Sequence, residues 1–263
     1  MMENLVNLSR YPIHDLDSSA GERLLAKCRN EMMDVGICML AEFLTPGAID
    51  RMKAEANSQL GNAFYCSNTH NAYLREDDPS LPRSHPGRRL LRTEVGSIAN
   101  DFLPADGALV RLYKWNCLTY FIGQVLGYEH FYRSADPLGA LSVNVFQPGG
   151  SHAWHFDESK YTVTVMLQPA ESGGEFEVVA NIRTQDDDNY DRVASILDGD
   201  CDAVVRLPFA PGTLFIFAGR HSLHRVTGVQ GARPRLVPVL AYAEHPEYVN
   251  SAQVRRLFWG RDH

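Results

Sequence analysis

The sequence predicts a mainly β domain, either a barrel or a double-sheet jelly roll, with flanking helices. Short segments rich in Val, Thr, Phe and Tyr recur between about residues 140 and 244. Turn signals such as Pro148-Gly149-Gly150 and Pro211-Gly212 separate these segments. Short strands at near-regular spacing, divided by such turns, are typical of both architectures. Apolar residues before position 135 recur at helical spacing instead, so the predicted class is α+β with strands in the majority.

Two helices are predicted near the start of the chain, with a strand between them. Ser18 is a good N-cap for the first helix. Thr45 caps the second helix, and Pro46 suits its first turn because proline is preorganised for that position. The apolar run at 36–40 predicts the intervening strand.

Three further segments stand outside the β-rich region. Residues 66–88 hold Pro, Asn, Ser and charged side chains without periodicity, which predicts a long loop of the kind that often forms a lid. Residues 109–125 have apolar positions at helical spacing and predict the longest amphipathic helix. A C-terminal helix is predicted over residues 247–259.

The β-rich region divides into strands at 140–182 and at 202–244. The acidic run at 186–189 is interpreted as a solvated turn, because its spacing is not that of an EF-hand calcium loop. No linker-like composition splits the chain, so one domain is expected over residues 1–263. Its parts are a helical N-terminal portion to about 135, a β core at about 136–245 and a C-terminal helix at about 246–263.

Composition restricts the classes of partner. A formal net charge of −7 argues against a nucleic acid or an anionic membrane as partner. No apolar run approaches the roughly 20 residues that a membrane span needs, and no signal peptide is evident. The five cysteines are scattered and odd in number, which indicates reduced thiols in a cytoplasmic protein. The oligomeric state stays open.

His155, Asp157 and His224 form the most informative pattern in the chain. Two imidazoles and one carboxylate suit a metal such as Fe(II), which accepts nitrogen and oxygen ligands. On a strand, the i, i+2 spacing of the first two residues would place both on one face, with Phe156 turned into packing. His224 then has to come from a distant strand. Three ligands on one side leave the opposite side of the metal open for a cosubstrate and dioxygen.

These segments resemble the Fe(II)- and 2-oxoglutarate-dependent oxygenases, which carry His-x-Asp and a distal His on a double-stranded β-helix, a cupin-like jelly roll. The likeness covers about residues 140–244 and lies in Trp154-His-Phe-Asp157, Tyr161-Thr-Val-Thr-Val-Met-Leu-Gln168, Gly173-Gly-Glu-Phe-Glu177 and Gly219-Arg-His-Ser-Leu-His-Arg-Val226. Within that superfamily the chain is most similar to a small group that acts on free amino acids and includes radical halogenases. In the halogenases Gly or Ala replaces the carboxylate ligand and chloride fills its place. This chain keeps Asp157, which favours oxygen chemistry.

The resemblance also implies residues that bind the cosubstrate. The family holds 2-oxoglutarate with an Arg about ten residues after the distal His, which leaves Arg233 and Arg235 as candidates. We favour Arg235, because it begins a predicted strand and would share a face with Val237 and Val239. Asn144, on an earlier strand, is a further candidate contact; the alternative is an ordinary hydrogen-bonded strand residue.

In the amino-acid group, the substrate carboxylate is held by an Arg upstream of the β domain, a His three residues before the first ligand and a C-terminal Trp. The matching residues here are Arg92, His152 and Trp259. Glu158 is a candidate partner for a substrate ammonium group, or else a solvated carboxylate. Catalytic groups beyond the metal ligands are not expected.

The resemblance therefore implies a dioxygenase, an oxidoreductase that oxidises an unactivated C–H bond of a free amino acid or a derivative. Hydroxylation is the expected outcome, with desaturation or cyclisation as alternatives, and succinate and carbon dioxide are the coproducts. A role in natural-product biosynthesis fits such an amino-acid hydroxylase. Two other interpretations stay open: an oxygenase that modifies proteins or peptides, and a metal-binding jelly-roll protein without turnover.

Overall fold

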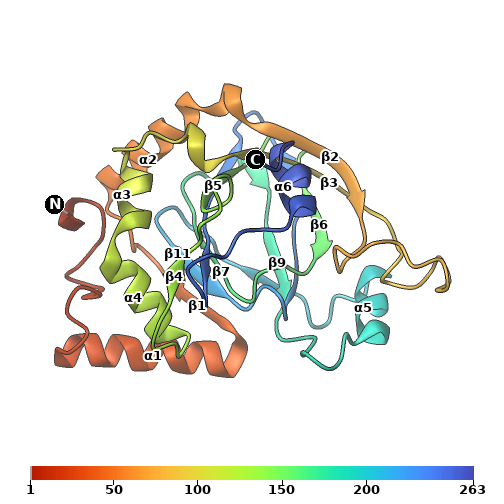
Figure 1. Ribbon diagram of the computed structural model, residues 1–263, viewed down its shortest axis with the longest axis horizontal. Helices are drawn as coiled ribbons and strands as arrows, with labels where there is room; N and C mark the ends of the chain where they lie inside the picture. Colours follow the sequence, from red (N-terminus) through yellow and green to blue (C-terminus); the bar gives the residue numbers. More distant parts are fainter. Residues whose placement is uncertain (1) are drawn as a thin grey trace.

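The computed structural model describes residues 2–263 and has two facing β-sheets flanked by helices (Figure 1). The helices are α1 Ser19–Val35, α2 Pro46–Ser58, α3 Ala108–Lys114, α4 Asn116–Val125, α5 Tyr190–Leu197 and α6 Ala252–Trp259. The strands are β1 Ile37–Leu40, β2 Phe64–His70, β3 Leu91–Ile98, β4 Tyr132–Arg133, β5 Leu141–Phe146, β6 His152–His155, β7 Thr162–Val165, β8 Ser172–Gly173, β9 Phe176–Val179, β10 Val205–Leu207, β11 Leu214–Phe217, β12 Leu223–Val226, β13 Val229–Gln230, β14 Arg235–Leu240 and β15 Tyr242–Ala243.

The larger sheet has seven strands in the order β1-β11-β7-β14-β5-β3-β2, and the smaller has the order β10-β9-β12-β6. Adjacent strands within both sheets are antiparallel. Two short ribbons, β13-β8 and β15-β4, complete the arrangement. Strands distant in sequence alternate in both sheets, so the predicted mainly β jelly roll is confirmed.

Alternation along the strands of the larger sheet separates its two faces. On β5, Leu141, Val143 and Val145 belong to the main core, which also contains residues of α1–α4. Ser142 and Asn144 have the opposite parity and line the cavity between the sheets. Helices α1–α4 therefore cover the outer face of this sheet, on the left in Figure 1. The inner face of the sheet faces the cavity.

The helix starts follow from capping chemistry. The Ser18 side chain accepts a hydrogen bond from the backbone N–H of Gly21, and Thr45 accepts one from Ala48. α1 ends at Gly36, whose φ of 68° lies in the left-handed region that glycine adopts without strain. These two predicted helices and the strand between them are confirmed.

The predicted single helix at 109–125 is wrong. Trp115 has extended backbone angles and divides the segment into α3 and α4, so α1 is the longest helix. The Arg133 guanidinium donates to the carbonyl of Lys114 and to Asn116 at this break. Periodicity could not reveal the break, because apolar residues of both halves stay buried in one core.

The region between residues 64 and 98 also differs from the prediction. The predicted loop at 66–88 begins too early, because residues 66–70 belong to β2, which pairs with β3. β1, β2 and β3 join the larger sheet, so the first 135 residues contribute strands as well as helices. The C-terminal helix α6 is shorter than predicted, and α5 follows the acidic turn at 186–189.

Among residues 2–263, no helix combines the length and apolar character needed to cross a lipid bilayer. The five cysteines all lie in this range and are free thiols, with Cys28, Cys38 and Cys66 buried.

Candidate active site

The three candidate metal ligands come together in the smaller sheet. His155 ends β6, and His224 lies directly opposite it on β12. Asp157 follows the end of β6, so the predicted placement of both first ligands on one strand is wrong. The strand ends before Phe156, whose backbone N–H donates to the carbonyl of Ala72. The Asp157 carboxylate nevertheless lies next to the imidazoles of His155 and His224.

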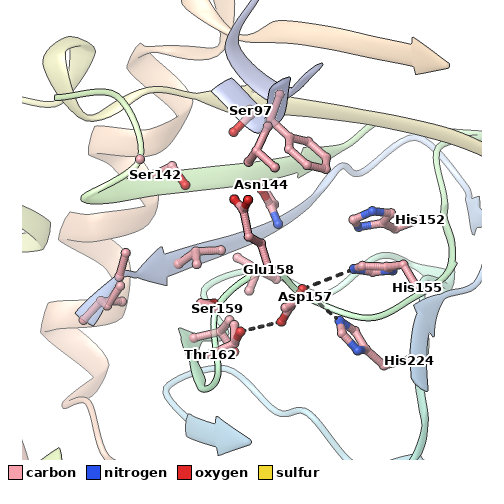
Figure 2. A pocket seen from close by; sticks show the side chains of 18 of the residues that line it. Ser97, Ser142, Asn144, His152, His155, Asp157, Glu158, Ser159, Thr162 and His224 are labelled. Atoms are coloured by element: carbon pink, nitrogen blue, oxygen red, sulfur yellow. Dashed lines mark hydrogen bonds and ion pairs between the residues drawn. The ribbon is translucent and has the colours of Figure 1, made fainter. Parts of the chain in front are cut away.

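The donor atoms of this triad face one another (Figure 2). Asp157 Oδ1 lies 3.5 Å from His155 Nε2 and 3.4 Å from His224 Nε2. Each imidazole Nδ1 lies against a backbone carbonyl, that of Ala153 at 2.8 Å and that of Ser222 at 2.9 Å. Because a carbonyl only accepts, each Nδ1 carries the proton and each Nε2 presents its lone pair to the centre of the triad.

The electrostatics of the triad also suit a metal. Burial, reinforced by neighbouring His224, lowers the pKa of His155 to about 4, so this imidazole is neutral at pH 7. Burial alone would raise the pKa of Asp157, but His224 and His155 outweigh it and hold that pKa well below its usual range. A neutral His155 and an ionised Asp157 are in the protonation states that a divalent metal needs.

Thr162 and Gly219 support the carboxylate ligand. The Thr162 hydroxyl donates a hydrogen bond to Asp157 Oδ2, the oxygen turned away from the imidazoles (Figure 2). The Asp157 backbone N–H donates to the carbonyl of Gly219 at 3.1 Å. A Cβ atom at position 219 would lie 2.1 Å from Asp157 Oδ2, so only glycine permits this close approach.

We expect Thr162→Val to weaken Fe(II) binding by about 10–100-fold, the range found when a partner that orients a metal ligand is removed. Valine preserves the shape of threonine but cannot donate to Asp157. Isothermal titration with Fe(II) under anaerobic conditions measures the effect. Thr184→Val is the control, because Thr184 caps an exposed turn away from the cavity. Equal Fe(II) affinity of Thr162→Val and the wild type would show that the Thr162 hydroxyl does not support the Asp157 ligand.

A cavity lies between the two sheets beside the triad. Its wall from the larger sheet includes these inner-face residues: Ser97, Ser142, Asn144, Phe146, Thr162, Thr164, Phe217, Arg235, Val237 and Val239. The smaller sheet adds His152, His155, Phe176, His224 and Val226. Residues of α6 and of the segment before it also line the cavity, and Figure 1 shows α6 beside β2 and β3.

Arg235 lies in this cavity wall with Val237 and Val239, on the face that the sequence predicted. It is 2% exposed, and its Nε has no hydrogen-bond partner among the described residues. Its guanidinium carbon lies 5.2 Å from the centre of the Phe146 ring and 5.8 Å from that of Phe209. Burial lowers the pKa of Arg235 to about 9, so it stays protonated at neutral pH as a buried cation.

Arg233 is placed differently. It is exposed, and its guanidinium donates to the carbonyls of Pro169 and Ala170 at 3.0 and 3.1 Å. Arg233 thus already has partners outside the cavity, whereas Arg235 presents a buried charge to it. Burying a charge without a partner is costly, so the cavity favours an anion at Arg235.

Four other predicted site residues line the same cavity: Asn144, His152, Glu158 and Trp259. The His152 ring stacks on His155 with centroids 3.7 Å apart, and its Nε2 has no hydrogen-bond partner among the described residues. The same holds for the indole Nε1 of Trp259. In Figure 2 the Glu158 carboxylate points toward Asn144, and it also accepts a hydrogen bond from the Ser251 backbone N–H at 3.3 Å.

Arg92 does not lie with them, which corrects the predicted placement. Its guanidinium is 68% exposed and binds Glu94 and Ser67 on the outer side of β3. Strand parity is the reason, because Thr93 faces inward, where its hydroxyl bonds to His70 and to the Ala153 backbone. The nearby arginines Arg88 and Arg89 pair with Asp77 and Asp198.

Several polar residues line the cavity that the sequence did not predict as site residues. Three have buried or partly buried positions on the inner side of the strands or near α6: Ser142, Thr164 and Tyr248. The hydroxyls of Thr164 and Tyr248 have no hydrogen-bond partner among the described residues. A signal was present on β5 and β7, where Ser142-x-Asn144 and Thr162-x-Thr164 alternate with core residues and so mark a polar inner face.

A model of the protein family described as halogenase D matches residues 20–256, which is most of the chain. No curated protein sequence is similar enough to count as a relative. Three similar solved structures are described next, and each aligned region covers most of this chain and most of the other protein's chain.

One similar structure is an oxidoreductase of the 2OG-Fe(II) oxygenase family from Burkholderia pseudomallei, 17% identical, with a TM-score of 0.52 over 85% of this chain and 92% of the other. A second is the epimerase SnoN in complex with Fe3+, alpha ketoglutarate and nogalamycin RO, 16% identical, with a TM-score of 0.59 over 85% and 84%. A third is a prolyl hydroxylase from Trichoplax adhaerens with a peptide fragment of hypoxia inducible factor, 18% identical, with a TM-score of 0.51 over 88% and 96%. At these identities the likeness establishes a common fold.

Proposed function

We propose that this chain, which belongs to the halogenase D family and to the Fe(II)/2-oxoglutarate oxygenase superfamily, oxidises an unactivated C–H bond of a free amino acid or a close derivative. The observation that carries the proposal is the joint presence of a complete His155–Asp157–His224 triad and a buried, unpaired Arg235 in one cavity. The triad accounts for the metal, and the buried cation accounts for a dicarboxylate cosubstrate.

The presence of Asp157 favours one of the two reactions associated with this group. A carboxylate oxygen here faces both imidazoles, so it occupies the position that a halide takes in the halogenases to which the sequence is similar. The Thr162 hydroxyl and the close approach of Gly219 hold that carboxylate in place. We therefore infer oxygenation for this chain.

His155, Asp157 and His224 would hold Fe(II), and Arg235 would hold the distal carboxylate of 2-oxoglutarate. Together Fe(II), 2-oxoglutarate and dioxygen supply the oxidising power to break a C–H bond, with release of succinate and carbon dioxide. A planar guanidinium such as that of Arg235 would orient this carboxylate, because it can donate two parallel hydrogen bonds. Phe146 and Phe209, which flank it, exclude water and so strengthen that pairing.

The other half of the cavity suits the two charged ends of an amino acid. His152 Nε2 and Trp259 Nε1 are buried atoms that have no hydrogen-bond partner within residues 2–263, and the Trp259 indole N–H can only donate. When its Nε2 carries the proton, His152 is a second donor to a substrate carboxylate. Glu158 provides the negative charge that an ammonium group needs.

Two alternatives are weaker. A metal-binding protein without turnover has no use for a buried, unpaired arginine beside its metal, because such a charge destabilises the fold. An oxygenase that modifies peptides, like the prolyl hydroxylase among the similar structures, needs space for a chain across its site. Here residues of α6, among them Phe258 and Trp259, line the cavity and leave less room.

The substrate assignment is tested by incubating the protein with Fe(II), 2-oxoglutarate and each free amino acid, followed by mass spectrometry. We expect one or a few amino acids to gain oxygen or lose two hydrogens, with matching succinate. Modification of a protein or peptide, with every free amino acid unchanged, would transfer the proposal to the peptide-modifying class.

The carboxylate contacts give a separate prediction. We expect the carboxamide of an accepted amino acid to be a poorer substrate by at least about tenfold, since losing one charge-assisted contact costs 1.4 kcal/mol or more. His152→Ala and Trp259→Phe should reduce this preference. Arg92→Ala is the matched control and should leave it unchanged, because Arg92 lies outside the cavity. Equal turnover of the amino acid and its carboxamide by the wild type would refute the proposed contacts of His152 and Trp259 with a substrate carboxylate.

A further inference from the structure

Leu74 has an unusual backbone conformation and lines the cavity. Its φ of 53° lies in the left-handed region, which disfavours side chains with a Cβ and is uncommon for large apolar residues. Three other described residues that are not glycine share this property, and two of them are asparagines, which tolerate it. Leu74 alone of the four lines the cavity. Strain that persists at a site indicates that the surrounding structure enforces it.

Asn71 enforces this conformation. Its side-chain Oδ1 accepts hydrogen bonds from the backbone N–H groups of Tyr73 and Arg75, and its Nδ2 donates to the carbonyl of Arg75. The Leu74 N–H donates to the Asn71 carbonyl. Asn71 is 3% exposed, so these bonds form a buried, tightly closed turn around Leu74.

The turn is also fixed to the metal-ligand loop. The Ala72 carbonyl accepts the hydrogen bond from the N–H of Phe156, which lies between His155 and Asp157 in the sequence. The Tyr73 ring packs on Phe156 with centroids 5.1 Å apart, and Arg75 forms an ion pair with Asp188. These contacts fix the turn to the segment between His155 and Asp157, and Leu74 lines the same cavity as those two ligands.

We propose that Leu74 is a specificity-determining residue, whose side chain closes the substrate part of the cavity and limits the size of the substrate side chain that fits. The proposal rests on the proposed function, since the substrate is assigned to the cavity that Leu74 lines. The strained turn is retained because an unstrained backbone would direct the leucine side chain elsewhere.

Removing the Leu74 side chain is expected to change selectivity by at least about tenfold, because a change of one or more methylene groups in an apolar pocket alters discrimination by about 10–200-fold. Leu74→Ala and Leu74→Gly should both raise kcat/KM for amino acids larger than the best wild-type substrate, relative to that substrate. Both should also raise succinate release without substrate, because water reaches the site more freely. Leu74→Gly should melt at a higher temperature than Leu74→Ala, since only alanine keeps the strain.

Glu42→Gly and Glu42→Ala are the matched controls, because Glu42 has a φ of 57° but is exposed and outside the cavity. They should show the same order of melting temperatures with no change in selectivity. The assay ranks the proteinogenic amino acids by kcat/KM in all five proteins. An unchanged ranking and unchanged substrate-free succinate release in both Leu74 variants would overturn the proposal. Wild-type turnover of 2-oxoglutarate that no amino acid stimulates would instead contradict the amino-acid assignment, and the substrate-free rate would still test Leu74.

Discussion

Replacing Arg235 by Met is expected to weaken the binding of 2-oxoglutarate by at least about 30-fold and to leave the unliganded protein at least as stable as the wild type. The loss of a charge pair inside a site costs about 2–5 kcal/mol, so the dissociation constant should rise by at least about 30-fold. The gain in stability follows because a buried guanidinium without a counterion is replaced by an apolar side chain of similar length.

Thermal unfolding measures both effects in one experiment. At about 100 times its dissociation constant, 2-oxoglutarate should stabilise the wild type by about 2.7 kcal/mol through mass action. The Arg235→Met protein should be stabilised by less than about 1 kcal/mol at the same concentration, because its dissociation constant is at least about 30-fold higher. Arg233→Met is the control and should respond like the wild type, because Arg233 is bound to backbone carbonyls outside the cavity. The reverse pattern would assign the cosubstrate to Arg233.

Replacing His155 or His224 by Ala is expected to reduce Fe(II) affinity by more than about 100-fold and to bring succinate release down to the enzyme-free background. Residues that merely support metal ligands already account for 10–100-fold, so loss of a ligand should exceed that range. The measurements are Fe(II) titration and succinate release under air. His221→Ala is the control, since His221 is near His224 in sequence but does not line the cavity. Succinate release at the wild-type rate from either ligand variant would refute the site.

Asp157→Gly separates the ligand role of the carboxylate from its effect on the reaction. We expect this variant to regain Fe(II) affinity when chloride is added, because a halide can occupy the position that Asp157 Oδ1 leaves. The wild type should show no such dependence on chloride. Equal chloride dependence in both proteins would mean that Asp157 does not occupy a metal position.

Much of the fold and of the site was predictable because alternation and capping are local. The two-residue period of β5 and β14 assigns one set of side chains to the helices and the other to the cavity, and this placed Arg235 correctly. The helix starts at Ser18 and Thr45 follow from side-chain hydrogen bonds that the sequence already implies. The proximity of His155 and His224 was predictable because it requires only that their two strands lie side by side, as β6 and β12 do.

The misplaced features depend on tertiary contacts. Arg92 lies on the outer side because Thr93 is bound inside, and no local signal fixes the parity of that strand. The break at Trp115 coincides with Arg133, which contacts both helix ends from a later strand. The conformation of Leu74 depends on hydrogen bonds to the side chain of Asn71. Leucine rarely adopts a positive φ, so the sequence does not predict this conformation.

Oxygenation at a metal held by His155, Asp157 and His224 is the central claim, and isotope labelling tests it most directly. The protein is incubated with Fe(II), 2-oxoglutarate, the panel of free amino acids, excess chloride and heavy-isotope dioxygen, and succinate and amino-acid products are analysed by mass spectrometry. We predict succinate that carries one heavy oxygen atom and an amino acid that is hydroxylated, desaturated or cyclised without chlorine. A chlorinated amino acid, or consumption of 2-oxoglutarate by the triple variant His155→Ala/Asp157→Ala/His224→Ala at the wild-type rate, would contradict the account.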